Sequence, residues 1–141
     1  MKKSQIKSFL KKQIKLSCYA EMDSLKPGNV HKYSSGHGMT AKDFYKSANI
    51  IANYLTQNNY HFGKKILKCV EEIKKKVKKN TNLGIILLFA PVISILLKNG
   101  FLDKRNLYKK ISLFIKSQNI KSSLPIFKAI KIAAPGGLGK S

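Results

Sequence analysis

Acidic side chains and arginine are the scarcest charged groups in this sequence. The 141 residues include 28 lysines and arginines but only six aspartates and glutamates, and the formal net charge is +22. An excess of this size is typical of proteins that bind nucleic acids or anionic membranes. Arg105 is the only arginine, however, and arginine is favoured where phosphates or bases are recognised bidentately. We therefore interpret the lysines mainly as a solvated surface and expect no specific nucleic-acid partner.

Cysteine and long apolar runs are also scarce. Cys18 and Cys69 are too few for a disulfide framework or a metal knuckle, so we expect a reducing, cytoplasmic setting. The basic N-terminus lacks the continuous apolar core and the cleavage site of a signal peptide. Leu83–Leu97 carries no charged residue, but a bilayer span needs about twenty residues. We therefore expect a buried core helix here and no membrane span.

The periodicity of the apolar residues predicts one all-α domain over residues 1–141, with about six helices around the central apolar helix Leu83–Leu97. Pro91 should kink this central helix or divide it in two. No strand pattern is convincing. The first expected helix runs from about Lys7 to Ser24, and the second runs from the Thr40-Ala41-Lys42-Asp43 capping box to Asn58-Asn59. The third carries Ile66, Val70, Ile73 and Val77 and ends at Asn80, and the fourth is Leu83–Leu97. The fifth is capped by Asp103 and carries Leu107, Ile111 and Phe114, and the sixth runs from about Leu124 to Ala133.

Glu21 is the most informative residue of the first helix. It lies at helical spacing from a stripe of apolar or small side chains, which are Leu10, Ile14, Ser17, Cys18 and Leu25. A carboxylate on an inward face costs free energy unless it is paired, hydrogen-bonded or bound to a cation. The alternative is a helix that frays early and leaves Glu21 in water. Pro27-Gly28 then ends the helix, and a polar loop with His31 and His37 follows.

Three ordered blocks carry a resemblance to a known family. The first contains Ala20-Glu21, Lys26–His31 and Gly36–Thr40, the second is Asn80–Gly84, and the third is Ala134–Gly139. Together they resemble the signature of the triphosphoribosyl-dephospho-CoA synthase family. The resemblance implies an ATP-dependent transferase, which moves the triphosphoribosyl group of ATP to a hydroxyl of dephospho-CoA or a related acceptor and releases adenine. It also implies magnesium as the cofactor.

Such a reaction needs a base for the hydroxyl proton, a cation for the triphosphate and donors for departing adenine. Asp43 and Asp103 are expected to cap helices and Glu71-Glu72 lie beside lysines, so Glu21 is left as base or metal ligand with Asp23 near it. His37, whose ordinary pKa is near neutral, is the second candidate catalytic residue. The candidate phosphate-binding residues are Lys26, Gly28, Asn29, His31, Asn80, Thr81, Asn82, Gly136 and Gly137. The polar groups of residues 80–82 either bind an anion or cap the helix that follows.

The chain departs from the family pattern in three ways. Gly38 stands where better-known synthases have an aspartate, and Asn82 and Leu83 replace their histidine and lysine. These changes indicate a divergent branch whose acceptor need not be dephospho-CoA. Relatives also continue past the Ala134–Gly139 turn, so 1–141 corresponds to their N-terminal part. We therefore expect this polypeptide alone to bind nucleoside triphosphate weakly, to release no adenine, and to self-associate or require a separately encoded C-terminal half.

Four other functions fit parts of the sequence. Net charge alone supports a basic RNA-binding protein, and the first helix together with Leu83–Leu97 supports a membrane-surface protein. An inactive truncated homologue is a third alternative. The fourth is a P-loop, because Ala134–Ser141 fits a relaxed form of that motif. A P-loop requires a strand before it and a helix after it, and here a helix precedes it, so we do not expect one.

Overall fold

A computed structural model describes residues 2–24, 39–79 and 81–134 of the chain. Over these ranges the secondary structure consists of six helices without a strand, which confirms the predicted all-α class. The helices are α1 (Lys3–Asp23), α2 (Ala41–Leu55), α3 (Phe62–Val77), α4 (Leu83–Asn99), α5 (Lys104–Lys116) and α6 (Ile120–Ala133).

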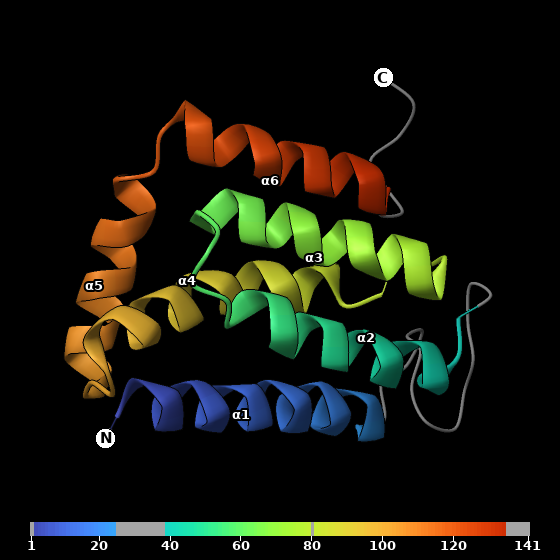
Figure 1. The fold of residues 1–141 in the computed structure, drawn as a ribbon, viewed down its shortest axis with the longest axis horizontal. Helices are drawn as coiled ribbons and strands as arrows, with labels where there is room; N and C mark the ends of the chain where they lie inside the picture. The colour runs from blue at the N-terminus through green and yellow to red at the C-terminus, as the bar shows by residue number, and fades with distance from the viewer. Residues whose placement is uncertain (1, 25–38, 80, 135–141) are drawn as a thin grey trace.

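Four of the helices form a layer, and a fifth helix packs behind it. In Figure 1, α1, α2, α3 and α6 lie side by side, each packed on the next, and α4 packs behind the first three. Helix α5 stands across the left-hand end in that view and contacts α4. The bundle therefore has two distinct ends, one crossed by α5 and one at the C-terminus of α1.

The core is built from the apolar stripes that the sequence predicts for α2 and α3. Ala48, Ile51 and Leu55 of α2 are buried together with Ile66, Val70, Ile73 and Val77 of α3. Apolar burial of this kind is the main favourable contribution to folding. On α1 the prediction needs one correction: Ser17 is exposed, and Met22 completes the buried stripe instead.

Helix α4 is central but is not covered on every side. It packs against α1, α2, α3 and α5, and it continues past Pro91 without a break in the helix. Ile86 is fully buried, whereas Leu88 is 71% exposed. No single described helix is long and apolar enough to span a membrane. Only α4 and α5 taken together, with a bend of 111° between them, have the length and composition of a membrane span.

Two helix starts show how local polar groups set the boundaries. Asp103 caps α5 as predicted, and its carboxylate accepts a hydrogen bond from the backbone N–H of Asn106 at 3.0 Å. Helix α6 begins at Ile120 rather than near Leu124, because the Asn119 side chain caps it by accepting from Ser122 N–H. Pro125 then lies within the helix instead of just after its start.

Candidate functional site

One end of the bundle collects the described parts of all three sequence blocks. The C-termini of α1, α3 and α6 and the N-termini of α2 and α4 lie at the right-hand end in Figure 1. These helix ends carry Glu21, Thr40, Thr81-Asn82 and Ala134. We call this region the motif end. Residues more than a hundred positions apart in the sequence are thus brought to one region by the packing of the helices.

Tyr45 of α2 holds the last turn of α1 at the motif end. Its hydroxyl donates a hydrogen bond to Asp23 Oδ1 at 3.2 Å. Its ring meets the ring of Tyr19 edge-on, with centroids 5.0 Å apart and an interplanar angle of 85°. Edge-to-face aromatic pairs are favourable beyond the area that they bury. These contacts fix the segment of α1 that carries Glu21.

Glu21 lies beside the buried stripe of α1, close to Cys18. The residue is partly buried, and its Oε2 atom is inaccessible to solvent. The pKa of Cys18 is raised to about 11, chiefly because the thiol is buried and secondarily because Glu21 carries negative charge nearby. The carboxylate therefore stands at the edge of the core, as the helical spacing indicates.

Glu21 and Asp23 do not form a ready-made metal site. Residues two positions apart on a helix point roughly 200° away from each other, and Asp23 is exposed and already accepts the Tyr45 hydroxyl. Over residues 2–24, 39–79 and 81–134, no three His, Cys, Asp or Glu side chains are grouped so that they could hold a metal ion. The two side chains therefore point to different sides of α1, and the metal-binding role of Glu21 and Asp23 stays a prediction.

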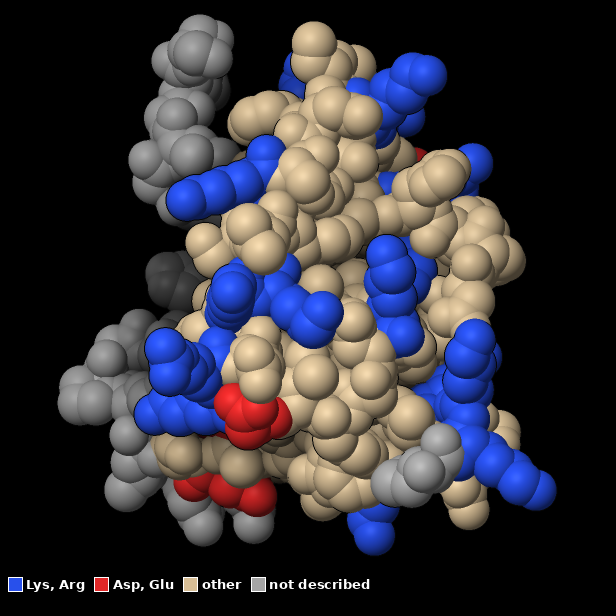
Figure 2. All heavy atoms as spheres, turned by 90° about the vertical axis from the view of Figure 1, so that its left-hand side faces the viewer, with Lys and Arg blue, Asp and Glu red and all other residues tan. Residues whose placement is uncertain are grey.

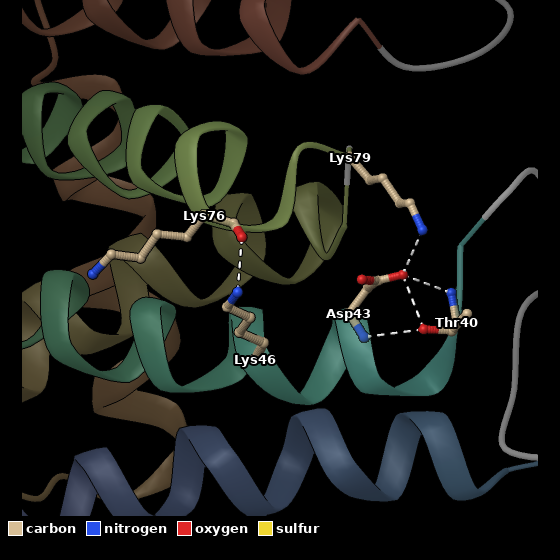
Figure 3. Close-up of polar contacts among 5 residues, drawn as sticks. All are labelled: Thr40, Asp43, Lys46, Lys76 and Lys79. Atoms are coloured by element: carbon tan, nitrogen blue, oxygen red, sulfur yellow. Dashed lines mark hydrogen bonds and ion pairs between the residues drawn. The ribbon is translucent and has the colours of Figure 1, made fainter.

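Asp43 connects the start of α2 to the segment after α3 (Figure 3). The predicted capping box is present: Thr40 N–H donates to Asp43 Oδ2 at 2.9 Å, and Asp43 N–H donates to Thr40 Oγ1 at 3.4 Å. Lys79 Nζ also donates to Asp43 Oδ2 at 2.9 Å. This ion pair was not expected from the sequence. The hydrogen bond from Lys79, followed by that from Thr40 N–H, lowers the pKa of Asp43 below its ordinary value of 3.8.

Replacing Asp43 with asparagine should lower the free energy of unfolding at neutral pH by about 1 kcal/mol. Because the folded-state pKa of Asp43 is depressed, its contribution is present above the unfolded-state value and is lost as the pH falls through the folded-state value. The difference between the two proteins in urea unfolding should therefore shrink progressively below pH 3.8. Glu71→Gln, which breaks an exposed pair with Lys68, is the control and should change stability less. A difference that does not depend on pH would contradict this role of the carboxylate.

A second link in Figure 3 joins α2 to the end of α3. Lys46 Nζ donates to the backbone carbonyl of Lys76 at 2.9 Å. Carbonyls in the last turn of a helix have no partner within the helix, and a cation near that end also interacts favourably with the helix dipole. The two links together hold the end of α3 and Lys79 against α2.

Asn82 holds the start of α4 against α2 instead of capping α4. Its φ of 60° is in the left-handed region, which asparagine tolerates better than most residues. The side chain is buried, and its Nδ2 donates to Ser47 Oγ and, at 3.3 Å, to the carbonyl of Phe44. No cap bond from its side chain to α4 is present. Of the two alternatives for this helix start, capping of α4 by the Asn82 side chain is therefore not observed, and both amide hydrogens already have acceptors within the protein.

Thr81 carries a buried hydroxyl without a partner. The residue is 2% exposed, and within the described chain no hydrogen bond reaches its Oγ1. Thr81 lines a cavity of about 10 Å³ together with Lys74, Lys79 and apolar side chains that include Ala133 of α6. Such a cavity has room for about one oxygen-sized atom. An unsatisfied buried hydroxyl costs roughly 1–3 kcal/mol, so its position beside two lysines indicates a place for a bound oxygen.

The other candidate residues lie outside the described ranges. These are Lys26, Gly28, Asn29, His31, His37, Asn80, Gly136 and Gly137. The structure therefore brings Glu21 and Asn82 to the same end of the bundle, beside the first turns of α2, and it does not test whether His37 joins them. The roles assigned to all these residues remain predictions.

Comparison with known proteins identifies the class of protein to which this helical fold belongs. Residues 7–141 match the family described as CitG, ATP:dephospho-CoA triphosphoribosyl transferase. The chain therefore belongs to this transferase family, as the three sequence blocks indicate. The family uses ATP, and membership implies a triphosphoribosyl transferase-like function with ATP and dephospho-CoA as substrates. Searches of curated proteins and of solved structures gave no match.

Proposed function

We propose that this protein transfers the triphosphoribosyl group of ATP to a hydroxyl of dephospho-CoA or a closely related acceptor. In this reaction the acceptor oxygen forms a bond to the anomeric carbon of ATP, and the bond from that carbon to adenine breaks. The hydroxyl proton passes to a base on the protein, and adenine leaves with the bonding electron pair. Family membership supports the class of reaction, and the residues of the motif end support the assignments that follow.

Thr81 is the central residue of the proposed phosphate-binding site. Its hydroxyl is buried without a partner in the described chain, and the residue lines a cavity that accommodates one oxygen-sized atom, together with Lys74 and Lys79. A phosphoryl oxygen of ATP bound there would accept the Thr81 hydrogen bond and lie beside these two lysines. Hydrogen bonds to charged groups are among the stronger ones in proteins. Asn80, Gly136 and Gly137 are the further phosphate-binding residues that we propose from the family resemblance.

Glu21 is the proposed base. Its carboxylate is partly buried at the edge of the core and lies at the motif end, and a positioned carboxylate can take the proton of the acceptor hydroxyl. Asp23 is less suitable because it is exposed and accepts the Tyr45 hydroxyl. His37 is proposed to assist proton transfer from the loop that follows α1.

Magnesium enters this proposal only together with the triphosphate. In proteins this ion is usually held by one or two carboxylates in addition to substrate phosphates. When bound, the ion would neutralise charge on the phosphates.

Cys18 and Cys69 are free and buried, and we propose the reducing cytoplasm as the location of the protein.

Replacing Thr81 with valine tests the phosphate site. Valine keeps the shape of the side chain and removes the hydroxyl, so ATP affinity should fall about tenfold or more if that hydroxyl contacts a phosphate. Stability should not fall, because a buried unpaired group is removed. Thr56→Val is the matched control, since Thr56 is also fully buried but donates to the Ala52 carbonyl. Isothermal titration with ATP and magnesium measures the ATP affinity of both variants and of the unaltered protein. Equal affinities for all three proteins would show that Thr81 is not part of the site.

Exposed apolar side chains on α6 support the expected self-association. Ile120, Leu124 and Phe127 follow at helical spacing, and Phe127 is 68% exposed. Helix α5 buries none of its residues within the described chain. Contiguous apolar surface of this kind marks sites of protein association, and we propose that copies of this chain or a separately encoded second half cover it. Light scattering of the purified protein tests the first possibility directly.

A further inference from the structure

The end of the bundle opposite the motif end contains a pocket that no motif predicts. Figure 2 faces this end and shows many lysines and few acidic residues. A pocket of about 300 Å³ lies here between the first turns of α1 and α3 and the last turns of α4. Lys3, Lys65 and Lys98 line it together with Asn58 and Ser94. We call it the lysine pocket.

Lys65 is the unusual member of the lysine pocket. It is only 8% exposed, and within the described chain its ammonium has neither a hydrogen-bond acceptor nor a carboxylate partner. Burial, and to a lesser extent the neighbouring charge of Lys7, lowers the pKa of Lys65. The side chain is thus mostly shielded from water, whereas its ammonium is not among the atoms that are fully buried without a partner. An ammonium that has lost part of its hydration and has no partner in the protein favours binding of an anion from solution.

The other groups around the pocket favour the same kind of ligand. Among the described lining residues none is acidic, and Lys3 and Lys98 add two more ammonium groups. The Ser94 hydroxyl already donates to the Ala90 carbonyl at 2.7 Å, which leaves the Asn58 amide as the neutral side-chain donor. The site thus offers positive charge and donors with no competing carboxylate.

Two phenylalanines fix the wall of the pocket. Phe62 of α3 and Phe114 of α5 meet edge-on with centroids 5.0 Å apart and an interplanar angle of 81°, and both line the pocket. This contact joins α5 to the start of α3, although the two segments are separated by about fifty residues. The pocket is therefore part of the folded bundle, and its volume is at the lower end of the range of small-molecule sites.

We propose that the lysine pocket binds a small polyphosphorylated molecule through Lys65, Lys3 and Lys98, as a second anion site separate from the motif end. Phosphate oxygens would supply the acceptors that the Lys65 ammonium lacks. Since Lys65 lies within a concave pocket, a terminal phosphate of a small molecule reaches it more readily than the backbone of a nucleic-acid duplex. This proposal does not depend on the transferase reaction, because none of the residues proposed for that reaction lines the pocket.

Inorganic tripolyphosphate is the probe, and amide chemical shifts show where it binds. Saturable shifts are expected at Asn58, Lys65 and Phe114, whereas shifts at Thr81 and Asn82 report the motif end separately. Lys65→Met should raise the dissociation constant at the pocket about tenfold or more. Lys75→Met is the matched control: it removes the same charge from an exposed position of the same helix and should have little effect.

The stability of the same variants separates loss of the site from loss of the fold. Methionine is an apolar side chain of similar size and suits this largely buried position, so the melting temperature of Lys65→Met should be equal to or above that of the unaltered protein. If this variant unfolds instead, Lys98→Met, at an exposed position of the same pocket, serves for the binding test. No saturable shift at Asn58, Lys65 and Phe114, or equal weakening by Lys65→Met and Lys75→Met, would overturn the proposal.

Discussion

Replacing Gly63 with alanine should detach the N-terminal part of α6 from α3. A Cβ atom at position 63 would lie 1.9 Å from the backbone carbonyl oxygen of Ser122 and 2.9 Å from its carbonyl carbon. Backbone atoms of a helix cannot move aside as the end of a flexible side chain can, so α6 must shift. Overpacking of well-packed sites costs about 1–3 kcal/mol and sometimes more. Here we expect at least that loss of unfolding free energy, measured by urea unfolding followed by circular dichroism.

Gly84→Ala is the control for this prediction. It makes the same chemical change near the start of another helix, but nothing lies within 4 Å of the new Cβ atom. Alanine is a better helix former than glycine by about 0.5–1 kcal/mol, so this variant should be slightly more stable than the unaltered protein. Equal stability of Gly63→Ala and Gly84→Ala would show that α6 does not pack against α3 as closely as described.

Replacing Glu21 with glutamine should slow the transfer step by about 10²–10⁴-fold, which is the usual contribution of a positioned base. Glutamine keeps the size of the side chain and can still form hydrogen bonds, but it cannot take the proton of the acceptor hydroxyl. ATP binding should change far less than the transfer step. The measurement is adenine release from ATP with dephospho-CoA and magnesium, under conditions in which the unaltered protein turns over, including any partner polypeptide that it requires.

Asp23→Asn is the matched control for Glu21. It removes one negative charge from the same helical turn, but the Asp23 carboxylate is exposed and accepts the Tyr45 hydroxyl. We therefore expect only a modest effect on adenine release. A Glu21→Gln protein with unchanged turnover, or an Asp23→Asn protein with the larger defect, would show that the base has been assigned to the wrong carboxylate.

The parts of the fold that could be predicted from the sequence are those set by neighbouring residues. The Thr40–Asp43 capping box and the Asp103 cap depend on groups three positions apart, and the buried stripe of α3 follows from helical periodicity. The start of α6 was predicted near Leu124, whereas Asn119 caps the helix about one turn earlier. Exposure of Leu88 depends on which helices cover α4, and local pattern does not encode that.

The candidate site divides in a similar way. The sequence blocks identify Glu21, Thr81 and Asn82, and the fold places them at one end of the bundle. The partner of Asn82 could not be predicted, because Ser47 is thirty-five positions away and only the packing of α4 on α2 brings them together. The burial of Lys65 could not be predicted for a related reason. In the sequence it is one of many lysines on an amphipathic helix, and it is buried only because other helices pack around it.

The most direct test of the central claim is an amide chemical-shift titration of the protein with ATP and magnesium, which detects weak binding as well as strong. If the triphosphate binds at the motif end, saturable shifts should appear at Glu21, Thr81, Asn82 and Leu83, and the shifts of residues 81–83 should be largely lost in the Thr81→Val protein. Shifts confined to the lysine pocket, or small shifts spread over the lysine-rich surface without saturation, would contradict the assignment of the motif end as the nucleotide site.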